Sequence, residues 1–162
     1  MDRLAALPRT SDFAPGNAKA NDASGSLPVT SCLTMVTSLA GLRALEADWR
    51  ALEVNAQGNP SVFQSFEWIA TWCSVYCNDD CDANIHIFAG YDRNRLVFLW
   101  PLMLKRRAGF NVLGWLTEPF GQYGDVLCAK GQNAPLWVTN ALRYIRRIRD
   151  IDILRLRHVR DD

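Results

Sequence analysis

The stretch NIHIFAGYDRNRLVFLWPLML, residues 84–104, ends in the longest apolar run of the chain. Its first half alternates, with Ile85, Ile87 and Ala89 facing one way, and the polar letters DRN separate it from the second half. This pattern predicts two strands joined by a hairpin turn. The second half is apolar at consecutive positions, which predicts cover on both faces. Pro101 cannot donate to a strand ladder, so we expect a bulge or a strand end there.

Helical periods precede this hairpin. A short β-prone stretch, residues 32–37, leads to Ser38, a residue type that caps helices. The first predicted helix then carries one apolar stripe at steps of three and four: Leu39, Leu42, Leu45, Trp49 and Leu52. The letters NAQGNP end it. A second helix is predicted after Ser65, with its apolar face formed by Phe66, Ile69, Ala70, Cys73 and Cys77.

The rest of the chain completes a mixed α/β pattern. Residues 112–117 and 125–129 read as two more strands around a loop, residues 132–149 as a helix, and residues 151–159 as a last strand. The predicted fold class is therefore α/β, with a mixed, largely antiparallel sheet flanked by helices. Residues 1–30 lack a lasting period and are predicted to be a disordered arm before one domain, residues 31–162.

Composition narrows the function classes. The 162 residues are 49% hydrophobic and 22% charged, and the formal net charge is +1. Such a balance is typical of a globular domain and predicts no attraction of the whole chain to nucleic acid. The longest apolar run is too short to span a bilayer. An odd number of cysteines, five, and no apolar leader favour a reduced, cytoplasmic protein.

The run TWCSVYCNDDC, residues 71–81, places three cysteines four residues apart. It does not match the spacing of zinc ribbons or ferredoxin-type clusters, which use tighter loops. Cys73 and Cys77 fall on the apolar face of the second predicted helix, where cysteine acts as a small hydrophobe. Cys81 lies past the expected helix end. We therefore predict core cysteines and no metal site.

Other candidate sites favour a structural interpretation. His86 and His158 are predicted to be half-buried strand residues, since no nucleophile motif accompanies them. The letters RRAGFN, residues 106–111, contain one glycine and resemble a hairpin turn more than a phosphate-binding loop. The end of the chain, residues 141–162, holds seven arginines against four aspartates. We interpret these arginines as the solvated face of a helix and predict no nucleic-acid partner.

The loop EPFGQYGDVL, residues 118–127, is the strongest candidate for a binding site. It places Gln122, Tyr123 and Asp125 between two apolar strands, and loops at strand ends often carry sites. A carboxylate beside a tyrosine hydroxyl could orient a nucleophile or hold a substrate amine. A buried turn that satisfies backbone donors is an equally good interpretation.

Several phrases resemble one known family. The segment LEADWRALEVNAQGNPSVFQSFEWIATWCSVY, and then LVFLWPLMLKRR, LTEPFGQYGDVLC and IDILRLRHVRDD, are similar to the CelD-like (cellulose-biosynthesis) branch of the GNAT N-acyltransferase superfamily. Its members carry a Phe-Gln-Ser phrase, a Pro-Leu strand and a Tyr-x-Asp segment. The similarity covers about residues 31–162. It implies a GNAT-like fold and transfer of an acyl group from acetyl-CoA or another acyl-CoA to an amine, small-molecule or saccharide, in polysaccharide or envelope metabolism.

The resemblance also implies that this chain is the N-terminal half of a two-unit protein, a fragment lacking its second GNAT-like unit and most of the acyl-CoA site. The superfamily's pyrophosphate loop, Arg/Gln-x-x-Gly-x-Gly/Ala, fails here, because Arg106-x-x-Gly109 is followed by Asn111. By position, Gln122, Tyr123 and Asp125 are the expected substrate contacts, and no catalytic residue is assigned. The alternative is a non-catalytic GNAT-like interaction or scaffold domain.

Overall fold

The computed structural model describes residues 27–77, 84–122 and 124–159. In chain order its elements are β1 (Ser31–Val36), α1 (Leu39–Ala44), α2 (Glu46–Val54), the 3-10 helix η1 (Val62–Gln64), α3 (Phe66–Tyr76), β2 (Ile85–Asp92), β3 (Arg95–Arg107), β4 (Phe110–Trp115), β5 (Leu127–Cys128), α4 (Ala134–Ile145) and β6 (Ile153–Leu154). The predicted fold class is confirmed: the fold is mixed α/β, with a largely antiparallel six-stranded sheet flanked by helices. The predicted disordered arm lies almost wholly outside the described residues.

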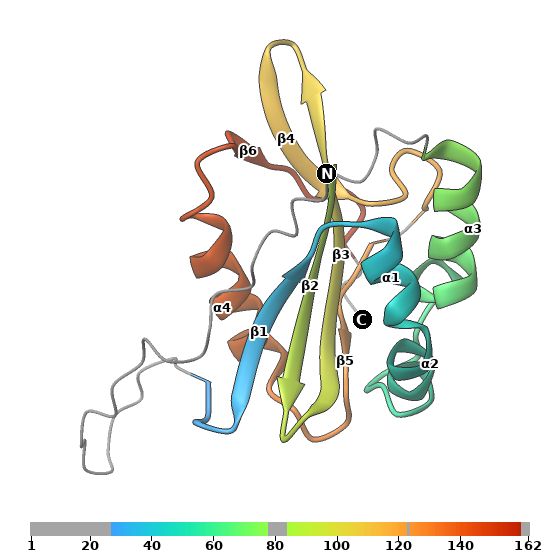
Figure 1. Cartoon of the computed structure of the whole chain (residues 1–162), viewed down its shortest axis with the longest axis vertical. Coiled ribbons are helices and arrows are strands. Elements are labelled where there is room, and N and C mark those ends of the chain that lie inside the picture. The colour runs from blue at the N-terminus through green and yellow to red at the C-terminus, as the bar shows by residue number, and fades with distance from the viewer. Residues whose placement is uncertain (1–26, 78–83, 123, 160–162) are drawn as a thin grey trace, which may run out of the picture.

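The hairpin of β2 and β3 forms the centre of the sheet (Figure 1). The two strands pair antiparallel from Ile85 opposite Met103 to Asp92 opposite Arg95, with one register shift at Gly90. Arg93 and Asn94 make the turn with positive φ, as a two-residue hairpin of this twist requires. The apolar run of β3 is buried at every position from 96 to 103, so the predicted cover on both faces is confirmed.

The prediction for Pro101 was wrong, because the proline lies inside β3 and pairs with Ile87. On its other side β3 is shared by two short strands, β5 along its first half and β4 along its second. The Pro101 carbonyl accepts a hydrogen bond from the Leu116 N–H, 3.3 Å away, at the point where the chain leaves the sheet. A residue's N–H and C=O face the same neighbour in an antiparallel pair. The missing N–H of Pro101 therefore faces the break between β4 and β5, where no ladder needs it.

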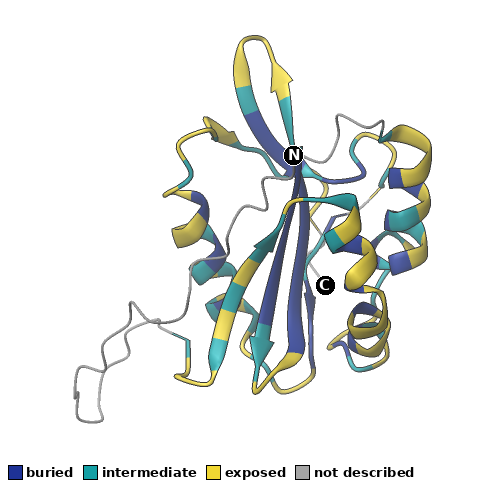
Figure 2. Ribbon diagram, viewed as in Figure 1, coloured by how far each residue is buried: buried dark blue, intermediate teal, exposed yellow. Residues whose placement is uncertain are grey.

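Helices cover both faces of the sheet: α1, α2 and α3 lie on one side and α4 on the other (Figure 1). Buried residues concentrate in the central strands and on the inner faces of the helices (Figure 2). Trp49 and Trp137, one from each helical layer, are fully buried. Gly90 allows α4 to approach closely, since a Cβ there would lie 2.6 Å from the Trp137 ring. The core is thus a sheet between two helical layers.

The first two predicted helices begin at the predicted caps, but the first and the last differ from the predicted bounds. Ser38 caps as expected, accepting from the Gly41 N–H at 3.0 Å, but the predicted first helix is divided at Leu45 into α1 and α2. Ser65 also caps as expected, and the Glu53 carboxylate accepts from the Phe66 N–H at 2.6 Å, so α3 begins with two caps. Helix α4 is shorter than predicted at both ends.

The last predicted strand is mostly irregular. Only Ile153 and Leu154 pair, in parallel with β4, and Val159 forms an isolated bridge with Gly124. The core interpretation of Cys73 is confirmed, since its side chain is 2% exposed, while Cys77 is half-buried at the end of α3 and Cys81 lies outside the described residues. Among the described residues, no helix is long and apolar enough to cross a membrane.

Candidate functional site

A cavity of about 380 Å³ opens between the α2–α3 loop and the segment that forms β5. The loop contributes one wall, the segment 125–128 contributes another, and Ala134, the first residue of α4, completes the lining. Its polar side chains come from Gln57, Asn59, Gln64 and Asp125. This cavity, named here the Asp125 cavity, contains one of the three predicted substrate contacts.

The α2–α3 loop is fixed to β5 by backbone hydrogen bonds. Ala56 bridges Ala129, the Gln57 N–H donates to the Cys128 carbonyl at 2.8 Å, and the Lys130 N–H donates to the Asn55 carbonyl at 2.9 Å. These bonds give β5 a short partner on its free edge. The wall of the Asp125 cavity is therefore held by the main chain and does not depend on side-chain packing alone.

Gln64 links the two walls. Its side-chain oxygen accepts from the Ser61 N–H at 2.8 Å, and its side-chain amide donates to the Val126 carbonyl at 3.1 Å. Its own carbonyl accepts from the indole N–H of buried Trp49, 3.0 Å away. Gln64 is 5% exposed, so these bonds replace water that it cannot reach.

Asp125 is half-buried in the lining of the cavity, and one of its carboxylate oxygens accepts from the Val126 N–H at 2.7 Å. Its position depends on Gly124, which rests on the Trp115 ring so closely that a Cβ would lie 2.1 Å from it. The Gly124 N–H donates to the His158 carbonyl and the Trp115 indole N–H to the Arg157 carbonyl, at 3.1 and 2.8 Å. The end of the described chain thus supports the loop that carries Asp125.

Of the other two predicted contacts, the structure describes Gln122. Gln122 is exposed and is not part of the cavity lining. Tyr123 lies outside the described residues. Asp125 lines the Asp125 cavity, and the contributions of Gln122, Tyr123 and Asp125 to substrate binding all remain predictions.

Glu118, at the start of the same loop, forms structural contacts. One guanidinium nitrogen of Arg155 donates to both of its carboxylate oxygens, at 3.0 and 3.1 Å, and the Lys105 ammonium donates to its carbonyl at 2.5 Å. Gly114 leaves room for the carboxylate, since a Cβ there would lie 3.0 Å from it. This half-buried ion pair connects the loop to the segment after β6.

The thiol of Cys128 on β5 and the imidazole of His86 on β2 are poorly suited to nucleophilic or base catalysis. Burial raises the pKa of Cys128, which lines the Asp125 cavity, to about 11, so its thiol stays protonated at neutral pH. Burial lowers the pKa of His86 on β2, whose Nδ1 lies 3.1 Å from the Asn84 carbonyl. His86 is not part of this lining. His86 lies in a strand, as predicted, but is buried and not half-buried. The same prediction was wrong for His158, which is exposed and lies outside the strands.

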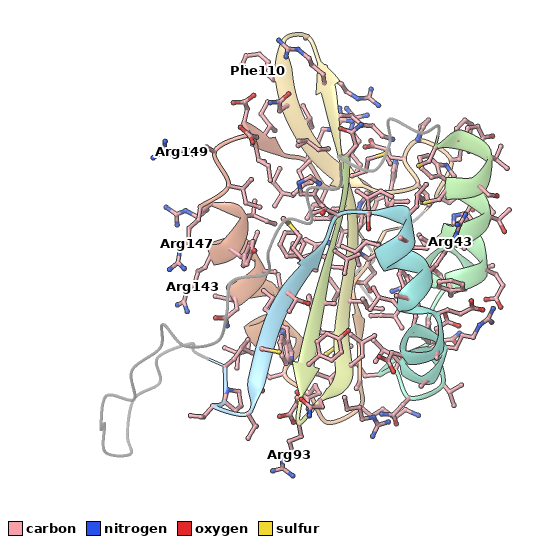
Figure 3. All side chains as sticks on the ribbon, viewed as in Figure 1. Arg43, Arg93, Phe110, Arg143, Arg147 and Arg149 are labelled. Atoms are coloured by element: carbon pink, nitrogen blue, oxygen red, sulfur yellow. The ribbon has the colours of Figure 1, made fainter. Side chains whose placement is uncertain are left out.

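The segment RRAGFN forms the hairpin turn between β3 and β4, as predicted. Ala108 and Gly109 both have positive φ, and Phe110 is exposed at the tip of the hairpin (Figure 3). The turn is the outermost part of the molecule at that end (Figure 1). It has no residue in the Asp125 cavity.

Sequence reasoning missed Gln64, Gln57 and Asn59 as cavity residues. A signal for Gln64 exists in the letters SVFQ, because a serine followed three residues later by glutamine is the pattern of a capping box. The glutamine half of that box forms around η1, where the Gln64 side-chain oxygen accepts from the Ser61 N–H. The roles of Gln57 and Asn59 arise from the pairing of the loop with β5, which no local pattern predicts.

No protein-family model matches the chain, and no curated protein matches it in sequence. Two solved structures are similar to it in arrangement. One is a possible acetyltransferase from Clostridium difficile 630, with 8% identity and a TM-score of 0.48 over 82% of each chain. The other is an integron cassette protein from the mobile metagenome of V. cholerae, with 12% identity and a TM-score of 0.46 over 80% of this chain and 76% of that one. Likenesses this distant concern the fold alone.

Proposed function

We propose that this chain is part of a GNAT-type acyltransferase that moves an acyl group from acyl-CoA to an amine, and that the Asp125 cavity holds the reacting groups. The proposal begins from the sequence resemblance to the CelD-like branch. The mixed α/β fold and the order of its elements agree with what that resemblance implies.

One observation carries the proposal. Two phrases of the resemblance, Phe-Gln-Ser and Tyr-x-Asp, contribute Gln64 and Asp125 to the same cavity, although they lie far apart in the sequence. The Gln64 amide donates to the Val126 carbonyl, beside Asp125, across 62 residues of chain. Convergence of polar side chains in one cavity is typical of binding sites.

The chemistry requires a base and no enzyme nucleophile. The amine lone pair attacks the thioester carbonyl, a C–N bond forms, the C–S bond breaks, and the proton lost by the amine returns to the departing thiolate. The Asp125 carboxylate lies in the cavity and can accept a proton from an ammonium or orient it. Cys128, with its raised pKa, remains a protonated wall residue and forms no acyl intermediate.

The finer parts of the proposal rest on the resemblance alone. They are the CelD-like branch, a small-molecule or saccharide acceptor, a cytoplasmic location, a role in polysaccharide or envelope metabolism, and a second GNAT-like unit beyond this chain that completes the acyl-CoA site. Gln122 and Tyr123 are proposed to reach the acceptor from the loop that carries Asp125.

The test is whether acetyl-CoA stabilises the chain. A ligand that binds only the folded state raises the melting temperature, by an amount set by its concentration relative to Kd. We expect a saturable rise with acetyl-CoA that is weakened in Gln64→Ala, which releases one wall of the cavity. The rise should be retained in Asp125→Asn and in Gln122→Ala, because both side chains are proposed to serve the amine. No shift at millimolar acetyl-CoA would count against an acyl-donor site in this chain.

A scaffold domain of the same fold is the second candidate. It is favoured by an exposed aromatic pair, Tyr76 on α3 and Phe120 in the loop after β4, whose rings stack at 4.9 Å while each side chain is more than half exposed. Exposed aromatic side chains are enriched at protein interfaces. Absence of acetyl-CoA binding, together with a partner whose binding is lost in Tyr76→Ala, would support this candidate.

A further inference from the structure

A second cavity, of about 290 Å³, lies at the end of the sheet where β2 turns into β3. Its charged lining consists of Arg93, Arg95, Lys130 and Asp92. Three cations against one carboxylate leave an excess of two positive charges. Among residues 27–77, 84–122 and 124–159, none of these three cations takes part in a salt bridge. This cavity, named here the Arg93 cavity, therefore presents positive charge that the described protein does not neutralise.

The single carboxylate is engaged by neutral donors. One oxygen of Asp92 accepts from the Thr30 and Ser31 hydroxyls, at 2.8 and 3.3 Å, and the other accepts from the Gln132 amide at 3.5 Å. The Thr30 hydroxyl is the main cause that lowers the pKa of Asp92, and Arg93 contributes least. Asp92 is thus held toward the start of β1 and Gln132, and it leaves the cationic groups available.

The backbone that carries the cations is held in place. The Arg93 N–H donates to the Thr30 carbonyl at 3.1 Å, which ties the hairpin turn to the segment before β1. The Ala129 N–H donates to the Val97 carbonyl at 2.8 Å and the Lys130 N–H to the Asn55 carbonyl at 2.9 Å. A frame that is fixed before binding lowers the entropy cost of gathering positive charge around an anion.

We propose that the Arg93 cavity binds a phosphate-bearing anion of about the size of a diphosphate. Arginine forks match phosphate oxygens in pairs and lysine adds a point charge, so the lining suits this chemistry. The site is separate from the Asp125 cavity, with which it shares no lining residue. Paired residues of the α2–α3 loop and the β5 segment line both cavities: Gln57 and Cys128 line the Asp125 cavity, and Asn55 and Lys130 line the Arg93 cavity. The phosphate can therefore belong to a free diphosphate or to the acyl-CoA of the proposed reaction.

The probe is sodium pyrophosphate, titrated into the full chain by calorimetry at constant ionic strength set with NaCl. We expect saturable binding of one equivalent. Combined Arg93→Gln, Arg95→Gln and Lys130→Gln changes should weaken it by at least about tenfold, since charge-assisted contacts are lost. The matched control removes the same charge elsewhere, with Arg146→Gln, Arg147→Gln and Arg149→Gln near the end of α4. Arg147 and Arg149 lie well away from Arg93 (Figure 3).

Equal weakening by the two triple variants, or linear binding that never saturates, would overturn the proposal, because either result describes general attraction between charges. Circular dichroism melting of both variants checks folding, and the exposed positions should leave it unchanged. A second titration with acetyl-CoA separates the sources. If the triple variant at Arg93, Arg95 and Lys130 also binds acetyl-CoA more weakly, the site holds the phosphates of the acyl donor. If its acetyl-CoA affinity is unchanged, the site holds a free phosphate. Pyrophosphate binding without acetyl-CoA binding would uphold this site while the proposed acyltransferase function fails.

Discussion

Gln64→Ala is expected to be the most informative single substitution, because one side chain joins both walls of the Asp125 cavity. The change removes two hydrogen bonds, to the Ser61 N–H and the Val126 carbonyl, and leaves both groups without that partner. Each such bond contributes about 1 kcal/mol net, and each buried group left unsatisfied costs about 1 kcal/mol or more. We therefore expect a loss of about 2–4 kcal/mol in the free energy of unfolding.

The assay is urea unfolding followed by tryptophan fluorescence, with thermal melting as a second readout. For a domain of this size, about 3 °C of melting temperature corresponds to 1 kcal/mol, which predicts a drop of roughly 6–12 °C. Gln57→Ala is the matched control, since Gln57 is also a glutamine of the Asp125 cavity but its side chain is exposed. Its backbone bond to Cys128 survives the change. The control should stay within about 0.5 kcal/mol of the parent protein.

The reasoning is refuted if Gln64→Ala costs less than about 1 kcal/mol. It is also refuted if Gln57→Ala is equally costly, because burial and bonding at position 64 would then not distinguish the two glutamines. Acetyl-CoA titration of both variants extends the comparison to the proposed site. There Gln64→Ala should weaken binding more than its loss of stability explains, since it releases the wall next to Asp125.

Three further predictions follow from packing and ionisation. Gly124→Ala would place a Cβ 2.1 Å from the Trp115 ring, so it should lower the free energy of unfolding by about 3 kcal/mol, and an unchanged urea midpoint would contradict the packing. Burial holds the pKa of folded His86 below 6.5, so the unfolded chain takes up this proton first as the pH falls. The contribution of neutral His86 to the free energy of unfolding is therefore complete above about pH 6.5 and is lost as the pH falls further. Between about pH 7 and 5, His86→Asn should lose stability less steeply than the parent protein, and equal slopes of unfolding free energy against pH would exclude this linkage. Burial raises the pKa of Cys128 to about 11, so this thiol should resist iodoacetamide at pH 8 until urea is added, whereas exposed Cys32 reacts in the folded protein. Mass spectrometry that shows early labelling of Cys128 would disprove its burial.

Much of the fold follows from local pattern. The β2–β3 hairpin, the caps at Ser38 and Ser65 and the turn at Gly109 are all predictable, because each depends on residues close together in the sequence. The effect of Pro101 was predicted wrongly because it depends on residues that are far away in the sequence. Its effect depends on which neighbour its N–H would face, and that is decided by the distant break between β4 and β5. The short β6 likewise pairs only where β4 offers a free edge.

The candidate site was predictable only in part. Asp125 was identified because a polar loop between apolar strands is where sites are built. Gln64 is part of the Phe-Gln-Ser phrase, yet its hydrogen bond to the Val126 carbonyl spans 62 residues of chain, and a local pattern cannot predict such a contact. The Arg93 cavity joins a hairpin turn to the segment before α4, so its charge cluster exists only in three dimensions.

The most direct test of the proposed function is to map acetyl-CoA on the full chain by two-dimensional NMR of its backbone amides. The proposal predicts that saturable shifts concentrate at the backbone amides of residues 56–59 and 125–128. The amides of Arg146, Arg147 and Arg149, which line neither cavity, should stay unchanged. Shifts that cluster instead around Tyr76 and Phe120, or no shifts at millimolar acetyl-CoA, would contradict the claim that the Asp125 cavity receives the acyl donor.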